Sequence, residues 1–585
     1  MCGIFAYTGQ KTNTAQNILE GLKTLEYRGY DSWGIAIKPL KTGKLEVEKH
    51  IGKIGEAHTD LPSSTFGIGH TRWATHGGVT DENAHPHTNK DKTIAVVHNG
   101  IVENHQELRK LLKTKGYQFL SETDSEVLAH LIDYIEHHEK LSFSESVMKC
   151  FGMITGSNAI VALNTESEEI VACRNGSPLV LGVGKDETLL ASDVTAILPY
   201  TRQVHYLLDG EGVVIGKDRS VRLFDLSLGK ESPLTLEKIE WSVENAQKGG
   251  YPHFMIKEIF EQKKTIFNAI HINSDKISLV SEAIKSADKV FLSGCGTAYH
   301  CALLGSYFLA RSGVASQAVP ANEFDAFAKT VKKNTVFIAI SQSGETADTL
   351  LAVKAAKQKG AKIVSIINAR GSTLERISDF YIPVNTGPEI AVVSTKAFTA
   401  QSAILYAIGK SLEAGKNIQK HEQILSQWLN DDLKINIFEI ARKLIDSKNI
   451  FVIGKHLQFV CALESALKIK EASYIHAEGF ASGELKHGVI SLIEKGTPTI
   501  VLADSETKTD VLSSATEMKS RGAIIIGISP FDAPEFDIHI KTPDMEDFSF
   551  IGNVIVGQIL GYALSVGRGC DPDKPRNLAK SVTVK

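Results

Sequence analysis

The sequence predicts a multi-domain α/β protein in which a sheet-rich N-terminal domain precedes two related domains with parallel sheets. The length of 585 residues corresponds to roughly three to four domains of typical size. Residues 1 to about 220 contain short apolar or alternating segments that are typical of strands. Beyond about residue 275, strands that end in glycine alternate with helices, and this order occurs twice.

The composition excludes several classes of protein. Apolar residues make up 43% and charged residues 23% of the chain, and the net charge of −4 gives no basic surface for nucleic acid. Stretches such as 336–340 and 523–528 are shorter than the roughly 20 apolar residues that span a bilayer. The N-terminus lacks the pattern of a secretory signal, and seven scattered cysteines do not form a disulfide framework. We expect a cytoplasmic protein without a membrane segment.

The N-terminal domain is expected over residues 2–220. Strands are predicted at 3–9, 34–40, 65–72, 93–100, 159–164 and 179–184, and helices at 18–27 and 124–139. The following stretch, about 221–255, is polar and contains glycine and proline, which favours a linker. We therefore expect a linker and a lead-in helix over 221–274.

The second part of the chain contains an internal repeat. VFLSGCGTAYHCALL at 290–304 aligns with IFVIGKHLQFVCALE at 450–464 through the strand, its terminal glycine and the triplet Cys-Ala-Leu. Each copy continues with further strands and helices in the βαβ order of a parallel sheet. The repeat predicts two duplicated domains, at 275–420 and 440–565, followed by a tail at 569–585.

The chain begins MCGIF, which places a cysteine directly behind the initiator methionine. This cysteine could be a small buried residue of the first strand. It could instead become the N-terminus after removal of the methionine. Its thiol would then lie beside an α-amine with a pKa of about 7.7 to 8.0 that can accept the thiol proton. Cys2 is therefore a candidate nucleophile.

Six motifs in order resemble the N-terminal nucleophile glutamine amidotransferases. They are MCGI, EYRGYDS, GHTRWATHG, AHPH, VHNGIVEN and ETDSEV. The resemblance implies an αββα glutaminase domain in which Cys2 attacks the side-chain amide of glutamine and Asn99 and Gly100 stabilise the oxyanion. It further implies that Trp73 gates an ammonia path. The implied glutamine-binding residues are Arg72 for the α-carboxylate, Asp124 for the α-ammonium, and Trp73, Thr75 and His76.

Histidines in these motifs raise the alternative of a metal site. His70, His76, His85, His87 and His98 include an H-x-H spacing that can bind zinc. No acidic residue recurs at a ligand spacing, so hydrogen bonding within the motif is the favoured interpretation. No metal and no organic cofactor are expected. One departure from the family pattern is Trp33, where a small residue is common.

The stretch ISQSGETADTL at 340–350 follows a predicted buried strand and opens a helix. Backbone N–H groups at a helix N-terminus, with nearby hydroxyls, are suited to binding a phosphate without a lysine. A helix cap would also use Ser and Thr here, but this run is richer than capping requires. We predict a phosphate site in this loop.

This run also resembles the sugar isomerase domain family, and residues 245 to 585 resemble the isomerase half of the glutamine–fructose-6-phosphate aminotransferases. Further motifs are GCGTAYH, STKAFT, ALKIKEASYIHAE, GELKHG and DPDKPRNLAKSVTV. The family usually carries Ser where this chain has Ala298, so one sugar contact is missing. The resemblance implies a sugar-phosphate site made by Ser341, Gln342, Ser343, Thr346, Thr297, Ser394 and Lys468.

The resemblance also implies three residues that carry the sugar chemistry, which are Glu471, His487 and Lys580. Glu464, Lys468 and Glu471 fall at i, i+4 and i+7, so they share one face of a predicted helix. Glu471 matches the carboxylate that moves a proton between C1 and C2. His487 matches a ring-opening histidine donated by the neighbouring subunit, and Lys580 matches a Schiff-base lysine in the tail. Smaller departures are Lys585 and the lysine of 261–263.

Together, the motifs imply synthesis of glucosamine 6-phosphate from fructose 6-phosphate and glutamine, the first step of hexosamine synthesis, by a homodimer. Neither nucleic acid nor membrane is an expected partner. One alternative is another amidotransferase, but its synthase half would need a nucleotide loop such as G-x-x-x-x-G-K-[ST], which does not occur. The others are a sugar-phosphate sensor, and a relative with glutaminase activity that acts on another sugar phosphate or has lost sugar conversion.

Overall fold

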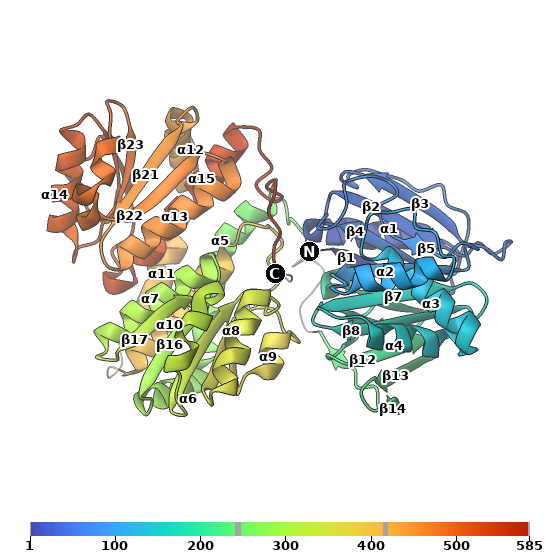
Figure 1. The fold of residues 1–585 in the computed structure, drawn as a ribbon. Helices are drawn as coiled ribbons and strands as arrows, with labels where there is room; N and C mark the ends of the chain where they lie inside the picture. The colour runs from blue at the N-terminus through green and yellow to red at the C-terminus, as the bar shows by residue number, and fades with distance from the viewer. Residues whose placement is uncertain (1, 240–246, 413–418, 583–585) are drawn as a thin grey trace. The chain divides into compact units, whose positions relative to one another are not determined.

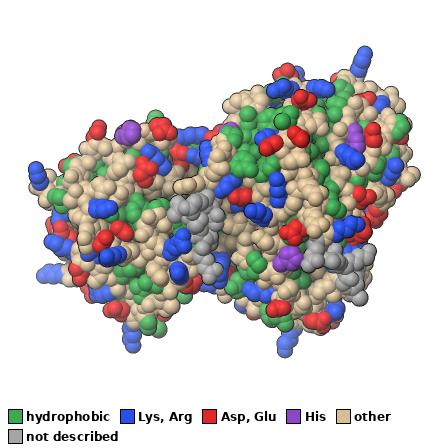
Figure 2. Space-filling view, turned by 180° about the vertical axis from the view of Figure 1, so that it is seen from behind, with side chains coloured by type: hydrophobic (Ala, Val, Ile, Leu, Met, Phe, Trp, Pro, Cys, Tyr) green, Lys and Arg blue, Asp and Glu red, His purple; other side chains and the backbone are tan. Residues whose placement is uncertain are grey.

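The computed structural model describes residues 2–239, 247–412 and 419–582. The chain divides into two compact units, Met1–Ala246 with Ala579–Lys585, and Gln247–Leu578 (Figure 1). Lys585, at which the sequence departs from the family pattern, lies outside the described residues. On the face shown in Figure 2, positive and negative side chains are interspersed over the surface.

The first unit contains two antiparallel sheets, formed among the described residues by eight and seven strands. In spatial order, the first sheet consists of β15 (Glu237–Lys238), β11 (Gln203–Tyr206), β9 (Val180–Val183), β10 (Glu187–Ala191), β1 (Gly3–Gly9), β4 (Phe66–Arg72), β2 (Ser32–Ile37) and β3 (Glu46–Ile51). The second consists of β14 (Lys230–Ser232), β13 (Val221–Asp225), β12 (Glu211–Ile215), β8 (Glu169–Asn175), β7 (Asn158–Asn164), β6 (Ile94–Gly100) and β5 (His87–Thr88).

Helices cover the outer face of each sheet. Helix α1 (Thr14–Leu25) packs on the first sheet, and α2 (His105–Thr114), α3 (Glu126–Glu139) and α4 (Phe143–Met153) form a core with the second. Strand β1 shows the principle, because Ile4 and Ala6 face the core between the sheets while Phe5 and Tyr7 face α1. All seven residues of β1 are buried for this reason. The layers follow the expected αββα order.

Two of these helices were not predicted from the sequence. The periodic segments that predicted α1 and α3 are confirmed. Helix α2 buries only Leu108 and Leu112 among its ten residues, so its apolar signal is weak. Helix α4 begins with a capping box, in which the Ser142 hydroxyl accepts from the Glu145 N–H and the Glu145 carboxylate accepts from the Ser142 N–H.

The expected linker from residue 221 is not found at that position. Val221–Asp225 and Lys230–Ser232 instead form the hairpin β13–β14 at the edge of the second sheet, and Glu237–Lys238 joins the first. Glycine and proline in this stretch therefore mark turns between short edge strands. Because edge strands leave most side chains exposed, their polar composition resembles that of a linker.

The second unit contains two parallel sheets, each with five strands among the described residues and with the same order. The first is β17 (Ser316–Pro320), β16 (Lys289–Gly294), β18 (Thr335–Ser341), β19 (Lys362–Ile367) and β20 (Phe380–Pro383). The second is β22 (His476–Ala481), β21 (Asn449–Gly454), β23 (Pro498–Leu502), β24 (Ile524–Ser529) and β25 (Ile538–Lys541). The matching strand orders confirm the predicted duplication.

Helices cover both faces of these sheets. They are α5 (Phe254–His271), α6 (Ser274–Lys285), α7 (Thr297–Arg311), α8 (Ala347–Gln358), α9 (Thr373–Ile377), α10 (Lys396–Leu412), α11 (Gln419–Trp428), α12 (Asp431–Leu444), α13 (Leu457–Ser473), α14 (Lys508–Lys519) and α15 (Phe550–Gly567). One large apolar core joins the inner faces of both sheets through α5, α7, α10, α13 and α15. The two copies therefore fold as one body.

Helix α15 is a longer apolar segment than the stretches considered from the sequence. The segment Glu546–Gly567 is long enough to cross a membrane and contains an 18-residue window with a mean hydropathy of 1.5, but 89% of that window is buried inside the protein. The core helix of a globular protein passes the same test. Here α15 packs along α13 and α12 in the shared core.

We predict that Leu223→Ala, on β13, destabilises the first unit by about 2–5 kcal/mol, because its side chain is buried between the sheets. Arg222→Ala, on the opposite face of the same strand, is the matched control and should cost no more than about 1 kcal/mol. Urea unfolding combined with hydrogen exchange over 211–225 measures both. Equal, small effects would mean that 221–225 is a linker after all.

Candidate active sites

Cys2 lies directly before β1, against the loop that follows β4. Its sulfur accepts a hydrogen bond from the Trp73 N–H at 3.3 Å and donates to the Trp73 carbonyl at 3.6 Å. Burial raises the pKa of the Cys2 thiol, while the Trp73 N–H and the Arg72 charge act in the opposite direction. The next residue, Gly3, has no room for a side chain, because a Cβ there would lie 2.7 Å from Thr71 Oγ1 and 2.9 Å from Leu25 Cβ.

Asn99, at the end of β6, presents its side-chain amide to this thiol-bearing residue. Asn99 Nδ2 donates to the Cys2 carbonyl at 3.1 Å and to Ser192 Oγ at 2.8 Å. His70 Nε2 lies 3.2 Å from Asn99 Oδ1, which fixes which end of the amide faces Cys2. Gly100 follows at φ +133°, a conformation that favours glycine. Sequence reasoning did not identify Ser192, because its position depends on the pairing of β10 with β1.

The predicted glutamine-binding residues surround this point. Arg72 holds the loop after β4 by donating to the carbonyls of Gly77 and Gly78 at 3.3 and 3.0 Å. Asp124 accepts from the Val102 N–H at 2.7 Å, and its charge acts to raise the pKa of the Cys2 thiol, against the effect of Arg72.

The loop after Arg72 carries the other three predicted residues. Trp73 packs edge-on against Tyr30, with ring centroids 5.6 Å apart. The exposed Thr75 precedes His76, whose ring lies 5.7 Å from that of His105. Trp73 and His76 are half-buried and Thr75 is exposed, so these side chains are accessible to a ligand.

Four of the five histidines in these motifs, all except His76, form a buried cluster behind Asn99. His70 stacks on His85 at 4.2 Å, and His85 meets His87 edge-on at 4.6 Å. His98 Nδ1 and Nε2 lie 2.8 Å from Ser125 Oγ and Asn158 Oδ1. Burial lowers the pKa of all four, that of His70 to about 3. Among the residues that the structure describes, no three His, Cys, Asp or Glu side chains are placed to hold a metal ion.

Trp33, the departure noted from the sequence, is buried in the core between α1 and the first sheet. Its ring lies 4.5 Å from that of His50, on the neighbouring strand β3. The larger side chain is therefore accommodated by packing between strands.

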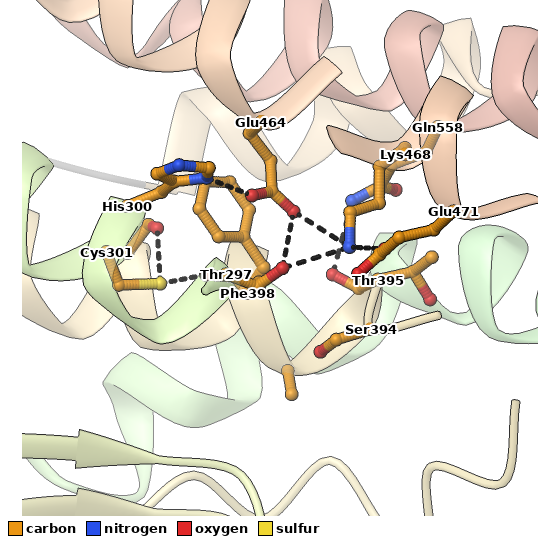
Figure 3. A network of polar contacts seen from close by, with 12 residues as sticks. Thr297, His300, Cys301, Ser394, Thr395, Phe398, Glu464, Lys468, Glu471 and Gln558 are labelled. Carbon is orange, nitrogen blue, oxygen red and sulfur yellow. Dashed lines mark hydrogen bonds and ion pairs between the residues drawn. The ribbon is translucent and has the colours of Figure 1, made fainter. Parts of the chain in front are cut away.

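A second polar cluster lies where α7 and α13 meet inside the second unit (Figure 3). Lys468 Nζ is 2.7 Å from Glu471 Oε2, 3.3 Å from Glu464 Oε1 and 2.9 Å from Thr297 Oγ1. The predicted helix face is therefore confirmed. Glu464 and Lys468 have fully buried side chains, whereas that of Glu471 is 22% exposed. The cluster joins one copy of the duplication to the other.

Electrostatics keep both members of the buried pair ionised. Burial acts to lower the pKa of Lys468, but the charges of Glu464 and Glu471 outweigh it and raise that pKa. Burial acts to raise the pKa of Glu464, but Lys468 and His300 outweigh it, so the pKa lies below its usual value. Sequence reasoning did not single out His300, although it ends the motif GCGTAYH.

The predicted phosphate loop runs from the end of β18 to the start of α8. Ser341 Oγ accepts from the Gly344 N–H at 2.9 Å, and Ser343 Oγ accepts from the Glu345 N–H at 3.2 Å. Gly344 has φ +66°, and a Cβ there would lie 2.1 Å from Ser372 Oγ. Thr346 occupies the N-cap of α8 without a side-chain capping bond. Its hydroxyl is therefore available to a ligand, as is the half-buried Gln342.

The corresponding loop of the second copy carries its own carboxylate. Phe337 and Thr499 are equivalent because each pairs with the phenylalanine at the same position of the repeat, on β16 and β21 respectively. Counting five residues on from each, Gln342 corresponds to Asp504. Asp504 accepts from the Thr507 N–H at 2.8 Å, from Thr507 Oγ1 at 2.7 Å and from Gln458 Nε2 at 3.0 Å. An internal anion in this loop opposes phosphate binding, so the first copy is the candidate phosphate site.

Ser394 lies near Lys468 and Glu471 in Figure 3 and donates to Glu389 Oε2 at 2.9 Å. Ala298 follows Thr297 and packs against Gly294, where a Cβ would lie 2.9 Å from that of Ala298. His487 is exposed at the end of a short turn, Ser482–His487, and is not part of the cluster. Lys580 is grouped with the first unit, so the second unit by itself does not place it beside Lys468.

These features define a glutamine amidotransferase joined to a pair of sugar isomerase domains. A family model for the glutamine amidotransferase domain matches residues 70–199, and a model for the SIS domain matches 283–411 and 443–543. The chain belongs to the family of glutamine–fructose-6-phosphate aminotransferases (isomerizing). It is 41% identical over 616 residues to that enzyme of Clostridium acetobutylicum and 43% over 610 residues to that of Pyrococcus horikoshii, with 100% of each chain covered.

One solved structure supports the assignment of the second unit. The C-terminal domain of glucosamine-fructose-6-phosphate aminotransferase from Francisella tularensis is 29% identical, with a TM-score of 0.50. The match covers 56% of this chain and 99% of that one.

Because these histidines are buried, we predict that the first unit loses stability in mild acid. Their folded pKa values lie below the unfolded value of about 6.5, so below pH 6.5 the unfolded chain binds protons that the folded chain does not. Each histidine should lower the unfolding free energy by up to about 1.4 kcal/mol per pH unit. Urea unfolding between pH 7 and 5 measures the slope, which His85→Asn should reduce. An unchanged midpoint would contradict the prediction.

Proposed function

We propose that this protein converts fructose 6-phosphate and glutamine into glucosamine 6-phosphate and glutamate. The observation that carries the proposal is the presence, on one chain of this family, of Cys2 facing the Asn99 amide and of the Lys468–Glu471 pair. The first arrangement is suited to releasing ammonia from an amide. The second is suited to moving a proton on a sugar.

In the first step, removal of the methionine makes Cys2 the N-terminal residue. Its α-amine accepts the thiol proton, and the sulfur attacks the amide carbon of glutamine. Asn99 Nδ2 and the Gly100 N–H stabilise the negative oxygen of the tetrahedral intermediate. Arg72 and Asp124 bind the α-carboxylate and α-ammonium of glutamine, and Trp73, Thr75 and His76 complete the pocket. Ammonia leaves, and water hydrolyses the thioester to glutamate.

In the second step, Ser341, Gln342, Ser343 and Thr346 bind the phosphate, while Thr297, Ser394 and Lys468 line the sugar. His487 delivers the proton that opens the ring, and Lys580 forms an imine with the C2 carbonyl. Ammonia displaces Lys580 from C2. Glu471 then removes a proton from C1 and returns it to C2, which leaves an amine at C2 and an aldehyde at C1.

We further propose that the protein acts in the cytoplasm as a homodimer through its SIS domains. The exposed position of His487 supports donation across a subunit interface, because the side chain is not engaged by the cluster of its own chain. The functional division proposed is a glutaminase domain, two SIS domains and a catalytic tail from residue 569. No metal or organic cofactor enters these steps.

Incubation with glutamine and fructose 6-phosphate tests the proposal directly. Mass spectrometry should detect glutamate and glucosamine 6-phosphate in equal amounts. Glutamate without amino sugar would favour another sugar phosphate as substrate, and Ala298 would be the first residue to restore to Ser. Binding of sugar phosphate without either product would mean a sensor.

Two variants separate the half-reactions. Cys2→Ala should abolish glutamine hydrolysis but retain amino sugar synthesis from added ammonia, because the isomerase residues are intact. Glu471→Gln should retain glutamine hydrolysis but lower amino sugar synthesis by about 10²-fold or more, because the proton-transfer base is lost. Loss of both activities in either well-folded variant would contradict the assignment.

Trp73→Ala should uncouple the two half-reactions. If Trp73 closes the ammonia path, its removal releases free ammonia, and glutamate should then exceed glucosamine 6-phosphate. Tyr30→Phe, which keeps the aromatic ring that contacts Trp73, is the matched control. Full coupling in the Trp73→Ala enzyme would count against the gate.

A further inference from the structure

The polar cluster of the second unit contains a histidine to which the steps above give no role. His300 Nδ1 lies 2.6 Å from Glu464 Oε2, on the side of the carboxylate away from Lys468 (Figure 3). Because the acceptor is a carboxylate oxygen, Nδ1 carries the hydrogen and donates. The His300 side chain is 14% exposed and that of Glu464 is fully buried, so this bond forms away from bulk water.

The duplication shows that folding alone does not require this bond. In the aligned repeats, His300 corresponds to Val460 and Glu464 corresponds to Leu304. Val460 and Leu304 are fully buried in the shared apolar core. The equivalent positions on α7 and α13 therefore hold two packed hydrophobic residues in one place and a hydrogen-bonded histidine and glutamate in the other.

The same asymmetry extends along both helices. Thr297 corresponds to Leu457, and Lys468 corresponds to Phe308. Leu457 and Phe308 belong to the same apolar core. The polar members of these four matched pairs lie together beside Ser394 and Glu471, where the sugar is proposed to bind. The histidine is therefore part of a cluster that differs from its repeat for a reason other than packing.

The contacts of Glu464 indicate what the histidine does. Oε1 accepts from Thr297 at 3.1 Å and is 3.3 Å from Lys468 Nζ, while Oε2 has the His300 bond. Without His300, a buried carboxylate oxygen would lose its donor. Rotation toward Lys468 would satisfy that oxygen, and Lys468 Nζ would then move away from Glu471, 2.7 Å distant.

We propose that His300 is a positioning residue for the sugar reaction. By holding Glu464, it keeps Lys468 bonded to Thr297 and Glu471, and so keeps the Glu471 carboxylate aligned for proton transfer between C1 and C2. This inference rests on the proposed function. It concerns the proton-transfer step and not phosphate binding, because the loop Ser341–Thr346 makes its own contacts.

The test compares three substitutions at one position. The side-chain amide of Asn places an N–H near the position of His Nδ1, whereas that of Gln reaches the position of Nε2. His300→Asn therefore restores the donor to Glu464, and His300→Gln and His300→Leu do not. His476→Leu, an exposed histidine of the same unit that contacts Asn449, is the matched control.

The full-length variants are assayed with ammonia as nitrogen source, and glutamine hydrolysis is measured separately. We expect kcat for amino sugar synthesis to fall by about 10- to 100-fold in His300→Leu and His300→Gln, a part of the ~10²–10⁴ that general acid–base catalysis contributes. KM for fructose 6-phosphate and glutamine hydrolysis should change little. Exchange of the C1 proton with deuterated solvent should slow in parallel, and His300→Asn should retain most of the wild-type kcat.

Several outcomes would overturn the proposal. These are a wild-type kcat in His300→Gln, an equal loss in the Asn and Gln variants, or a raised KM with kcat unchanged. If His300→Leu does not fold, the comparison of Asn with Gln still decides. A wild-type protein that forms no amino sugar from glutamine and fructose 6-phosphate would refute the proposed function itself, whereas an active wild type with an equally active Gln variant would refute only the role of His300.

Discussion

The ammonium group of Lys468 is enclosed in the protein, and the second unit is organised around the compensation of that charge. Glu464 and Glu471 supply two carboxylates from the same helix, and Thr297 supplies a hydroxyl from the other copy of the duplication. Removal of one partner from a buried ion pair typically costs about 3–5 kcal/mol. The bonds of Thr297 to Lys468 and Glu464 therefore tie the position of α13 to that of α7. They also make the geometry of the proposed sugar site depend on the packing of both copies.

This constraint explains why the duplicated copies have diverged. A symmetric pair would carry two copies of the proposed phosphate loop and two polar clusters. Instead, the first copy provides Ser341–Thr346, and the second provides Glu464, Lys468 and Glu471 on α13. The loop of the second copy contains Asp504, and the residues of the first copy that match Glu464 and Lys468 are the apolar Leu304 and Phe308. Neither copy alone holds a complete set of residues.

The first unit meets a different requirement, which is to place the candidate nucleophile Cys2 at the start of a buried strand. Gly3 lets β1 approach Thr71 and Leu25, so that Cys2 reaches the Trp73 backbone. The Asn99 amide is held between Ser192 and His70. Because the surrounding histidines are kept neutral by burial, they supply directional hydrogen bonds without adding positive charge beside Arg72.

Local patterns in the sequence determined much of this protein. The duplicated strand-glycine-helix segments, the periodicity of α1 and α3, the helix face of Glu464, Lys468 and Glu471, and the candidate nucleophile are visible without coordinates, because each depends on residues close together in the chain. Family motifs added the expected roles. What only the tertiary structure decided are the contacts between distant segments.

His300 and Glu464 are separated by 164 positions, and Asn99 and Ser192 by 93. The strands at 221–238 are likewise stabilised by pairing with β12 and β11, while their own composition is that of a loop. No spacing rule connects such residues. Their partners follow from how sheets and helices pack, and packing depends on the burial of the whole core and not on any one segment.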